Sequence, residues 1–353
     1  MIRSDHWKFS RQVLPGVFSV TLPLPGEKPG PVNAYLFKGK DNITLLDTGT
    51  SKGFEILKSA LAEHGLTCDD IDRIVLTHSH IDHYGAVKKI LRASSSFIDV
   101  AGNFARTVSI ATGLGVSRKT MGDFLSLMGV PPLVRNSMRV LSSAFALLGE
   151  KCRVTSFIKE GQTITMGDYD CRVIETPGHT TDSICLYVEQ DNVLFSGDHI
   201  LPHITPNAFV MLEEGRPLPT RLSQKEFYES VDKVNRLAPC LVFPAHGRPM
   251  EDLAAVTRMY AENFSQRENL ILGIITGGES VVYRIARKLF PRLNTARLPL
   301  EIFLAVSEVY THIQMLEFRG IVATRVEGDR LIISPATDAG QAPAMVGEKR
   351  PLL

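Results

Sequence analysis

Histidines crowd into one short stretch of this chain. THSHIDHYGA, residues 77–86, contains His78, His80 and His83 together with Asp82, although the 353 residues hold only ten histidines. Residues two apart in an extended segment project to the same side, so His78 and His80 can converge on one cation. Asp82 and His83 come where the chain turns into a helix, and they can point to a second position nearby. One stretch can therefore begin two metal sites.

Three other loops offer the further ligands that such sites need. Each loop follows a β-type run and contains Pro or Gly. TPGHTTDS (176–183) offers His179, FSGDH (195–199) offers Asp198, and FPAHG (243–247) offers His246. Loops held by a rigid scaffold bring distant residues to a common site. The pattern therefore predicts a dinuclear metal centre.

These segments together resemble the metallo-β-lactamase superfamily. HSHIDH at 78–83, PGHT around His179, SGD at Asp198 and AHG at His246 have the order and rough spacing of its motifs, and LLDTG (45–49) matches a further signature. The resemblance covers about residues 15–270. It implies an α+β fold, a four-layer αββα sandwich with the metals at one edge of the sheets.

The resemblance also implies seven metal ligands in two groups that share one carboxylate. They are His78, His80 and His179 for the first metal, Asp82, His83 and His246 for the second, and Asp198 bridging both. The catalytic residues are expected to be Asp82 and Asp198. The expected ions are two Zn, with Fe or Mn as alternatives, because His and Asp ligands accept all three metals. Two cations that share one water lower its pKa and give a bridging hydroxide for hydrolysis.

Asp198 in the bridging position narrows the choice among relatives. Antibiotic-hydrolysing enzymes with two zincs usually carry Cys or His near that role, and flavodiiron relatives use a Glu in the first cluster. The ligand set is similar instead to that of glyoxalase II, lactonases and nucleases. We expect a hydrolase of a small ester or thioester, and the alternatives are a lactonase and a phosphodiesterase or single-strand endoribonuclease. The C-terminal region does not resemble a glutathione-binding domain, so glutathione thioesters are not specifically expected.

Three further polar residues are candidates for orienting the ligands. Asp47 and Asp182 could hold ligand imidazoles in place, although Asp47 could also cap the turn before Gly49. His199 follows Asp198, but neighbours on a strand face opposite sides, which favours a structural role. The remaining histidines are interpreted as solvated or hydrogen-bonded side chains: His6, His64, His203 and His312.

The elements that position these residues follow from apolar periodicity and turn residues. Strands are expected at 17–25, 32–40, 43–49, 71–79, within 154–178 and 183–197, and at 240–247. Helices are expected at 51–65, 82–94, 223–237, 251–276, 280–290 and 300–319. The order strand, helix, strand over 43–79 places the histidine cluster at the end of a strand. Asp82 is the expected N-cap of the helix that follows.

The same pattern divides the chain into a large and a small unit. A metallohydrolase domain is expected over 1–270, a winged-helix-like domain over 271–336 with a hairpin around 327–329, and a flexible tail over 337–353. A helical insertion rich in Leu and Met occupies about 103–150. It could cover the site as an apolar lid or form part of a homodimer interface, and the packing role is favoured. The apolar residues considered for the lid are Met121, Phe124, Leu125, Met128 and Met138.

Composition restricts the partners. Thirty-nine Lys and Arg residues nearly balance 38 Asp and Glu residues, and residues 279–335 hold eight Lys or Arg against six Asp or Glu. Such a small excess argues against nucleic-acid binding without excluding it and favours a small-molecule substrate. Five scattered cysteines and the lack of a signal or membrane-spanning run predict a cytoplasmic protein with no membrane association.

Overall fold

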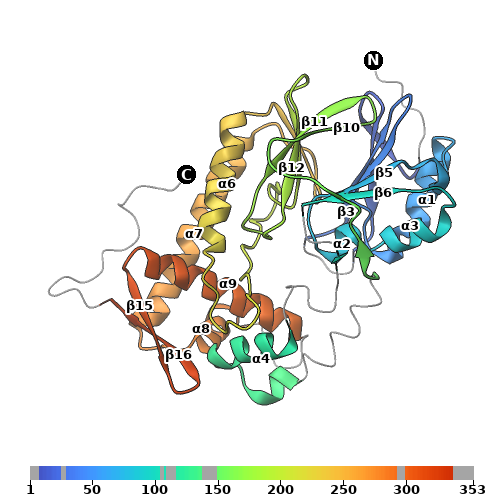
Figure 1. The fold of residues 1–353 in the computed structure, drawn as a ribbon. Helices are drawn as coiled ribbons and strands as arrows, with labels where there is room; N and C mark the ends of the chain where they lie inside the picture. The colour runs from blue at the N-terminus through green and yellow to red at the C-terminus, as the bar shows by residue number, and fades with distance from the viewer. Residues whose placement is uncertain are drawn as a thin grey trace.

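Two β-sheets lie face to face in the computed structural model, and helices cover the outer face of each sheet (Figure 1). The structure describes residues 8–24, 29–103, 107–108, 117–136, 149–291 and 299–336. The four layers confirm the predicted αββα sandwich. Met138 and the tail at 337–353 lie outside the described residues.

Seven strands form the first sheet, in the order β1-β2-β3-β4-β5-β6-β9. They are β1 (Arg11–Leu14), β2 (Val17–Leu22), β3 (Val32–Lys38), β4 (Ile43–Leu46), β5 (Arg73–Leu76), β6 (Asp99–Gly102) and β9 (Ser156–Phe157). Neighbours from β1 to β4 are antiparallel, whereas β4, β5, β6 and β9 run parallel. The helical turn η1 (Ser51–Gly53) and helix α1 (Phe54–Glu63) connect β4 to β5, with η2 (Cys68–Asp70) before β5. This connection is the strand-helix-strand unit expected to deliver the histidine cluster.

Five strands form the second sheet, in the order β10-β11-β12-β13-β14. They are β10 (Thr163–Met166), β11 (Tyr169–Glu175), β12 (Ile184–Val188), β13 (Val193–Gly197) and β14 (Leu241–Pro244). All neighbours are antiparallel except β13 and β14, which α6 (Ser223–Leu237) connects in parallel. A separate pair, β7 (Thr107–Val108) with β8 (Cys152–Arg153), joins the two ends of the insertion.

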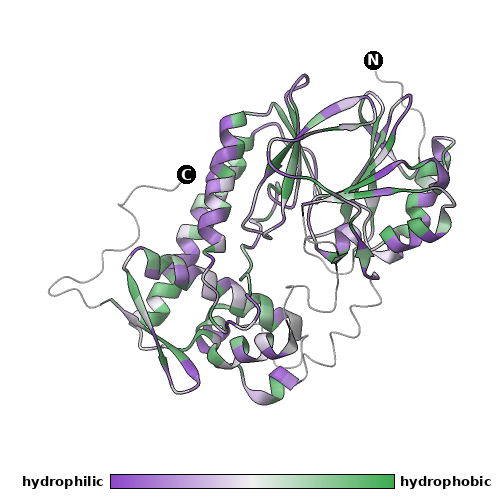
Figure 2. Ribbon diagram, in the orientation of Figure 1, coloured by the Kyte–Doolittle hydropathy of each residue, from purple (hydrophilic) through white to green (hydrophobic). Residues whose placement is uncertain are grey.

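Strand β3 shows why these segments form a sandwich. Tyr35 and Phe37 belong to the hydrophobic cluster between the two sheets, whereas Ala34 and Leu36 belong to the cluster under α1 and α3 (Val87–Ala93). Alternate residues of a strand face opposite sides, so a strand covered on both faces must be apolar at every position. Figure 2 accordingly shows strands that are mainly hydrophobic, whereas hydrophilic and hydrophobic residues alternate along α6.

The predicted helix at 82–94 is two helices. Helix α2 (Ile81–Tyr84) begins after His80, which is its N-cap, and α3 begins at Val87. The expectation that Asp82 caps this helix is therefore wrong, because its carboxylate faces His246 instead of the first backbone amides. Gly85 lies between the helices, where Gly149 at the end of the insertion approaches its backbone so closely that a Cβ on Gly149 would lie 2.5 Å from Cα of Gly85.

The C-terminal elements and the insertion form a separate hydrophobic cluster. Helices α7 (Leu253–Thr276), α8 (Val282–Leu289) and α9 (Pro299–Phe318) precede a hairpin of β15 (Val322–Glu327) and β16 (Arg330–Pro335). The hairpin lies where the sequence predicts it. Helix α7 continues across 270/271, the predicted domain boundary. The domain division and the winged-helix assignment remain predictions.

The described part of the insertion packs against these C-terminal helices. Helix α4 (Arg118–Leu127) buries Phe124, and the ring of Phe124 lies 5.5 Å from that of Tyr310 on α9. Leu125 and Met128 are buried in the same cluster, and Met121 packs against it. Three of these residues are core residues of this chain and Met121 packs against them, so the structure assigns the four neither to a lid nor to a dimer interface. The sequence favours a packing role, but the surface that they pack against belongs to the same chain.

All five cysteines are free, and only Cys240 is exposed. No helix among the described residues combines the length and the apolar character needed to cross a bilayer. The cytoplasmic location remains a prediction.

Candidate metal centre

The structure brings all seven predicted ligands together at the ends of four strands. His78 and His80 follow β5, His179 follows β11, Asp198 follows β13, and His246 follows β14. Asp82 and His83 lie on the short helix α2. The residues form two groups, His78, His80, His179 and Asp198 in one and Asp82, His83 and His246 in the other. Within each group one candidate ligand atom per residue lies within 4.8 Å of all the others.

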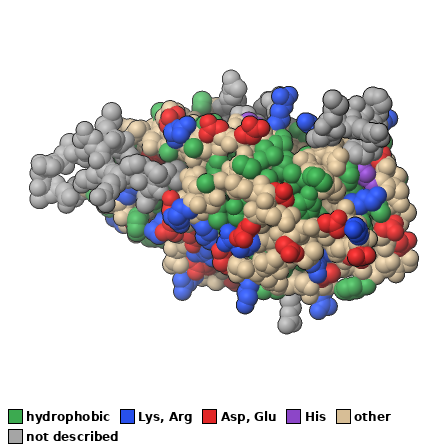
Figure 3. Space-filling model, turned by 90° about the horizontal axis from the view of Figure 1, so that it is seen from above, with side chains coloured by type: hydrophobic (Ala, Val, Ile, Leu, Met, Phe, Trp, Pro, Cys, Tyr) green, Lys and Arg blue, Asp and Glu red, His purple; other side chains and the backbone are tan. Residues whose placement is uncertain are grey.

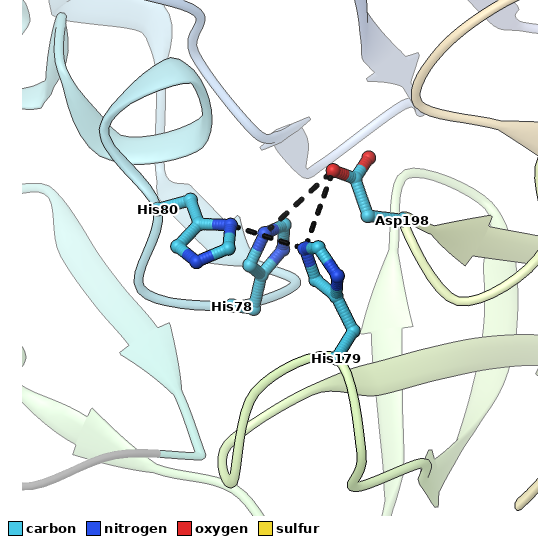
Figure 4. Close-up of side chains that lie close together, drawn as sticks. All are labelled: His78, His80, His179 and Asp198. Carbon is cyan, nitrogen blue, oxygen red and sulfur yellow. Dashed lines mark hydrogen bonds and ion pairs between the residues drawn. The ribbon is translucent and has the colours of Figure 1, made fainter. Parts of the chain in front are cut away.

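The first group has three imidazoles around a common point. Figure 4 shows the rings of His78, His80 and His179 converging, with the carboxylate of Asp198 directed towards them. Nδ1 of His80 and Nε2 of His179 lie 3.1 Å apart, and Nε2 of His179 lies 3.6 Å from Oδ2 of Asp198. Nε2 of His78 lies 3.9 Å from the same oxygen. One carboxylate oxygen and three ring nitrogens therefore face one another.

The second group faces the other oxygen of Asp198. Oδ1 of Asp198 lies 3.5 Å from Nε2 of His83 and 3.4 Å from Nε2 of His246. Oδ2 of Asp82 lies 3.5 Å from the same atom of His246. The two oxygens of Asp198 are thus divided between the groups, which is the geometry of a bridging carboxylate.

Hydrogen bonds on the outer side of three histidines fix their orientation. Nδ1 of His83 lies 2.7 Å from Oδ2 of Asp47, Nδ1 of His179 lies 2.9 Å from the carbonyl oxygen of Asn207, and Nδ1 of His246 lies 2.9 Å from that of Pro31. Because these oxygens accept a hydrogen bond from the N–H of Nδ1, Nε2 is the ring nitrogen that faces the centre in each histidine. The contact of Asp47 is the one that the sequence hypothesis expected, whereas the two carbonyl contacts have no signature in residue types.

Several buried polar atoms of the site lack a hydrogen-bond partner. Within the described part of the chain, Nε2 of His78, His83 and His246 and Oδ1 of Asp198 make no hydrogen bond. Buried polar atoms without partners are costly, and in native proteins they are usually satisfied by water or an ion. All four atoms are donors of lone pairs to metals and point into the two groups. The residues therefore fit a pair of divalent cations.

The electrostatics differ between the two groups. Burial disfavours the charged forms of His83 and His246, but the neighbouring carboxylates outweigh it and raise the pKa of both rings, so a cation bound there would displace a proton. Burial and the neighbouring imidazoles hold the pKa of His78 well below its usual range, and burial lowers the pKa of His80 to about 3, so both rings are neutral as ligands must be. Burial opposes ionisation of Asp198, but the charges of His246 and His83 hold its pKa well below the usual value. Asp198 is therefore a carboxylate in the folded protein.

Two glycines allow the loops to reach this arrangement. Gly178 precedes His179 with a φ of 133°, and a Cβ on it would lie 2.4 Å from Cα of Phe227 on α6. Gly197 precedes Asp198 with a φ of 52°, and a Cβ there would lie 2.9 Å from Cβ of Thr77. Both conformations favour glycine and both approaches exclude a side chain. The local sequence therefore sets where His179 and Asp198 lie.

Two of the weaker candidates contact other groups. Asp182 is buried, its side chain is hydrogen-bonded by Thr180 and Ser79 and not by a ligand histidine, and burial raises its pKa. The ring of His199 is buried 5.1 Å from that of Phe227, and burial lowers its pKa to about 3. This environment agrees with the structural role favoured for His199.

Charges of both signs are mixed over the surface seen in Figure 3, and hydrophobic side chains gather near its centre. No broad patch of Lys and Arg is visible among the described residues on that face. The described residues of the face shown therefore offer a polyanion no broad patch of positive charge.

Comparisons with known proteins agree with this site. A family model described as "Metallo-beta-lactamase superfamily" matches residues 28–95 and 153–246, which include all seven candidate ligands. The chain is 26% identical to a probable metallo-hydrolase, YqjP of Bacillus subtilis, over 89% of this chain and 96% of the relative. It is 28% identical to a beta-lactamase-like protein 2 homolog of Drosophila melanogaster, over 68% of this chain and 66% of that one.

Solved structures share the fold over almost the whole chain. A metallo-beta-lactamase family protein from Thermus thermophilus has a TM-score of 0.71 at 23% identity and covers 92% of this chain and 100% of its own. A beta-lactamase domain protein from Burkholderia ambifaria has a TM-score of 0.69 at 20% identity and covers 93% and 95%. The likeness therefore extends beyond the residues that the family model matches.

Proposed function

The chain belongs to the metallo-β-lactamase superfamily and is a metal-dependent hydrolase, and from that premise we propose that it uses two metal ions to hydrolyse a small ester or thioester. The observation that carries the dinuclear proposal is the division of the Asp198 oxygens. One faces His83 and His246, and the other faces His78 and His179. A single ion would need only one of these oxygens.

The proposed ions are Zn²⁺. The ligands are five imidazoles and two carboxylates, a set that zinc accepts and that Fe and Mn also accept, so metal supply contributes to the choice. When bound, two divalent cations supply Lewis acidity, lowering the pKa of water towards neutrality and polarising the scissile carbonyl.

The residues of the chain supply position and proton exchange. Asp198 is almost completely buried and is held between imidazoles, which suits a fixed bridge. The Asp82 side chain is 14% exposed, against 7% for Asp198, and its Oδ2 lies 3.5 Å from Nε2 of His246. In the proposed mechanism Asp82 therefore exchanges the proton that the attacking water gives up and the leaving group receives.

The acyl assignment depends on charge and on apolar surroundings. The near balance of acidic and basic residues offers a polyanionic substrate little attraction. Partly buried Phe209 lies beside the first group, and its ring is 5.6 Å from that of His80. Apolar walls suit an acyl substituent better than a phosphodiester with its charged backbone.

A substrate panel tests the proposal. The protein loaded with zinc is assayed with p-nitrophenyl esters, acyl thioesters, a lactone, bis-p-nitrophenyl phosphate and single-stranded RNA. We expect the highest kcat/KM among the esters and thioesters. Asp198→Asn should lose that activity, which distinguishes it from a contaminant. Cleavage of RNA or phosphodiester alone would replace the acyl assignment with a phosphodiesterase, and preferential lactone opening would make the protein a lactonase.

A further inference from the structure

A segment outside the helices and strands connects the metal centre to the C-terminal helices, and its alternating burial is typical of an extended chain. Residues 206–212, PNAFVML, alternate between buried and partly buried positions. Ala208 is buried in the cluster under the second sheet, and Val210 and Leu212 are buried in the cluster around α9. Side chains alternate in an extended chain, so Asn207, Phe209 and Met211 share the opposite side.

Both ends of this segment are fixed by hydrogen bonds. The carbonyl oxygen of Asn207 lies 2.9 Å from Nδ1 of His179, and the amide of Val210 donates to Oγ of Ser307 on α9 at 2.7 Å. Phe209 therefore lies where the backbone is hydrogen-bonded on one side to a candidate metal ligand and on the other side to helix α9. Its position is determined by backbone contacts on both sides and does not depend on its own packing alone.

The Phe209 ring lies against the first group of ligands. Its centroid is 5.2 Å from that of His179 and 5.6 Å from that of His80, at interplanar angles of 58° and 78°. His80 and Phe209 are both partly buried, so this contact lies where the group meets solvent. A ring in that place presents an apolar surface next to the point where a carbonyl would react.

We propose that Phe209 and Met211 form an apolar subsite that binds the acyl chain of the substrate and makes the hydrolase prefer medium-length acyl groups over acetyl. The proposal rests on the proposed acyl function and names its substrate class more closely. An aromatic ring and a flexible thioether adapt well to a linear alkyl chain. The ring is only partly buried in the protein, so a chain that covers it removes apolar surface from water.

Binding of product-like carboxylates tests the subsite without turnover. Acetate and hexanoate are titrated into zinc-loaded wild type, Phe209→Ala and Phe157→Ala by calorimetry. Phe157 is 61% exposed on β9 and is the matched control. Wild type should bind hexanoate at least about tenfold tighter than acetate, as expected for added methylenes in an apolar pocket. Phe209→Ala should lose most of that ratio, and Phe157→Ala should keep it.

Two results would overturn the subsite. One is a wild type that binds both carboxylates equally. The other is a Phe209→Ala protein that weakens both to the same extent or contains less zinc, because the ring would then only support His80 and His179. If Phe209→Ala does not fold, Met211→Ala provides the same measurement and should reduce the hexanoate preference, whereas an unchanged ratio would contradict the proposal. Phe209→Leu should restore part of the preference.

Measurements of ester turnover distinguish an error in the proposed subsite from an error in the proposed acyl hydrolysis. The ratio of kcat/KM for p-nitrophenyl hexanoate over acetate should fall about tenfold in Phe209→Ala, mainly through KM. If wild type hydrolyses neither ester but still prefers hexanoate in the binding experiment, the subsite stands and the proposed acyl hydrolysis is wrong. If wild type hydrolyses both esters with no chain-length preference, the function stands and the subsite is wrong.

Discussion

Oδ2 of Asp47 lies 2.7 Å from Nδ1 of His83, and both side chains are almost completely buried. The same carboxylate accepts hydrogen bonds from the amide and the hydroxyl of Thr77, the residue that precedes the histidine cluster. Asp47 itself has a φ of 59°, which is uncommon outside glycine. Its carboxylate therefore fixes both the end of β5 and the ring of a candidate ligand.

Asp47→Asn should weaken binding of the second metal by about 10- to 100-fold, as loss of an outer-shell partner typically does. One oxygen of Asp47 accepts from the amide of Thr77, and the other accepts from the hydroxyl of Thr77 and from His83. An amide has one acceptor oxygen, so it cannot replace both oxygens of the carboxylate. The ring of His83 can then take the other tautomer and turn a proton towards the centre. Competition with a chromophoric chelator measures the affinity. Asp41→Asn, on the exposed turn before β4, is the control, and equal affinities in the two variants would contradict this role.

Asp198→Asn and His246→Gln should differ in metal content. Purified wild type is expected to contain about two ions per chain, as a dinuclear hydrolase does. His246→Gln removes a ligand from one group only, so about one ion should remain. Asp198→Asn affects both groups and should leave less than one ion, with kcat reduced at least about 1000-fold through loss of metal-based charge stabilisation. Elemental analysis with circular dichroism checks metal and fold, and full occupancy in Asp198→Asn would disprove the bridge.

Removal of metal by a chelator should lower the Tm and zinc should restore it. A ligand that binds only the folded state stabilises it by about 2.7 kcal/mol at 100 times its Kd. Without the metal, Nε2 of three buried imidazoles has no hydrogen-bond partner in the described structure. Scanning calorimetry at several zinc concentrations measures the effect. A Tm that does not depend on zinc would mean that the site does not bind it.

The lowered pKa of Glu63 predicts that the attachment of the N-terminal segment to helix α1 depends on pH. Desolvation is the largest single influence on its pKa and raises it, but hydrogen bonds from the amide of Phe9, the hydroxyl of Ser10 and the amide of Lys8 together outweigh it, and the pKa falls below the usual value. A lowered carboxyl pKa stabilises the folded state above the unfolded pKa of about 4.3, and this contribution is lost as pH falls through the folded value.

Glu63→Gln should therefore lower the Tm near pH 7, and the difference from wild type should shrink as the pH falls through the lowered pKa of Glu63 in the folded protein, because both side chains are then neutral. Glu55→Gln on the same helix is the control, because its pair with Lys58 is exposed and contributes little. Thermal unfolding at a series of pH values gives the comparison. A constant difference across the series would rule out ionisation of Glu63 as the cause.

Phe124→Ala should destabilise the folded state by about 3–5 kcal/mol, the usual range for a buried Phe. The ring is fully buried against Tyr310 in the C-terminal cluster. Leu133→Ala, at a side chain that is 83% exposed, should change stability by less than about 0.5 kcal/mol. Denaturant unfolding measures both. Phe124→Ala should keep the wild-type substrate preference while folded, and an altered preference would support the lid role that the structure does not assign to this residue.

The sequence by itself identified the candidate ligands that the structure brings together, because the histidines cluster within one loop and the other candidates stand next to Gly or Pro at strand ends. It also indicated the strands, since a strand covered on both faces must be apolar throughout. The helix at Ser223–Leu237 has the predicted bounds, because one buried face and one solvated face leave a clear period.

Only the tertiary structure decided which surfaces meet. Periodicity shows that Phe124 belongs to an apolar face, but not that Tyr310, far along the chain, lies opposite. The support of His179 comes from a backbone carbonyl, which every residue has, so no residue type could reveal Asn207. The sequence analysis missed Phe209 because the histidines beside it come from distant loops. The alternating pattern of 206–212 is visible in the sequence, but it does not show which residues lie next to this ring. The local sequence determines which face of a helix or strand is apolar, and long-range packing determines which surface covers that face.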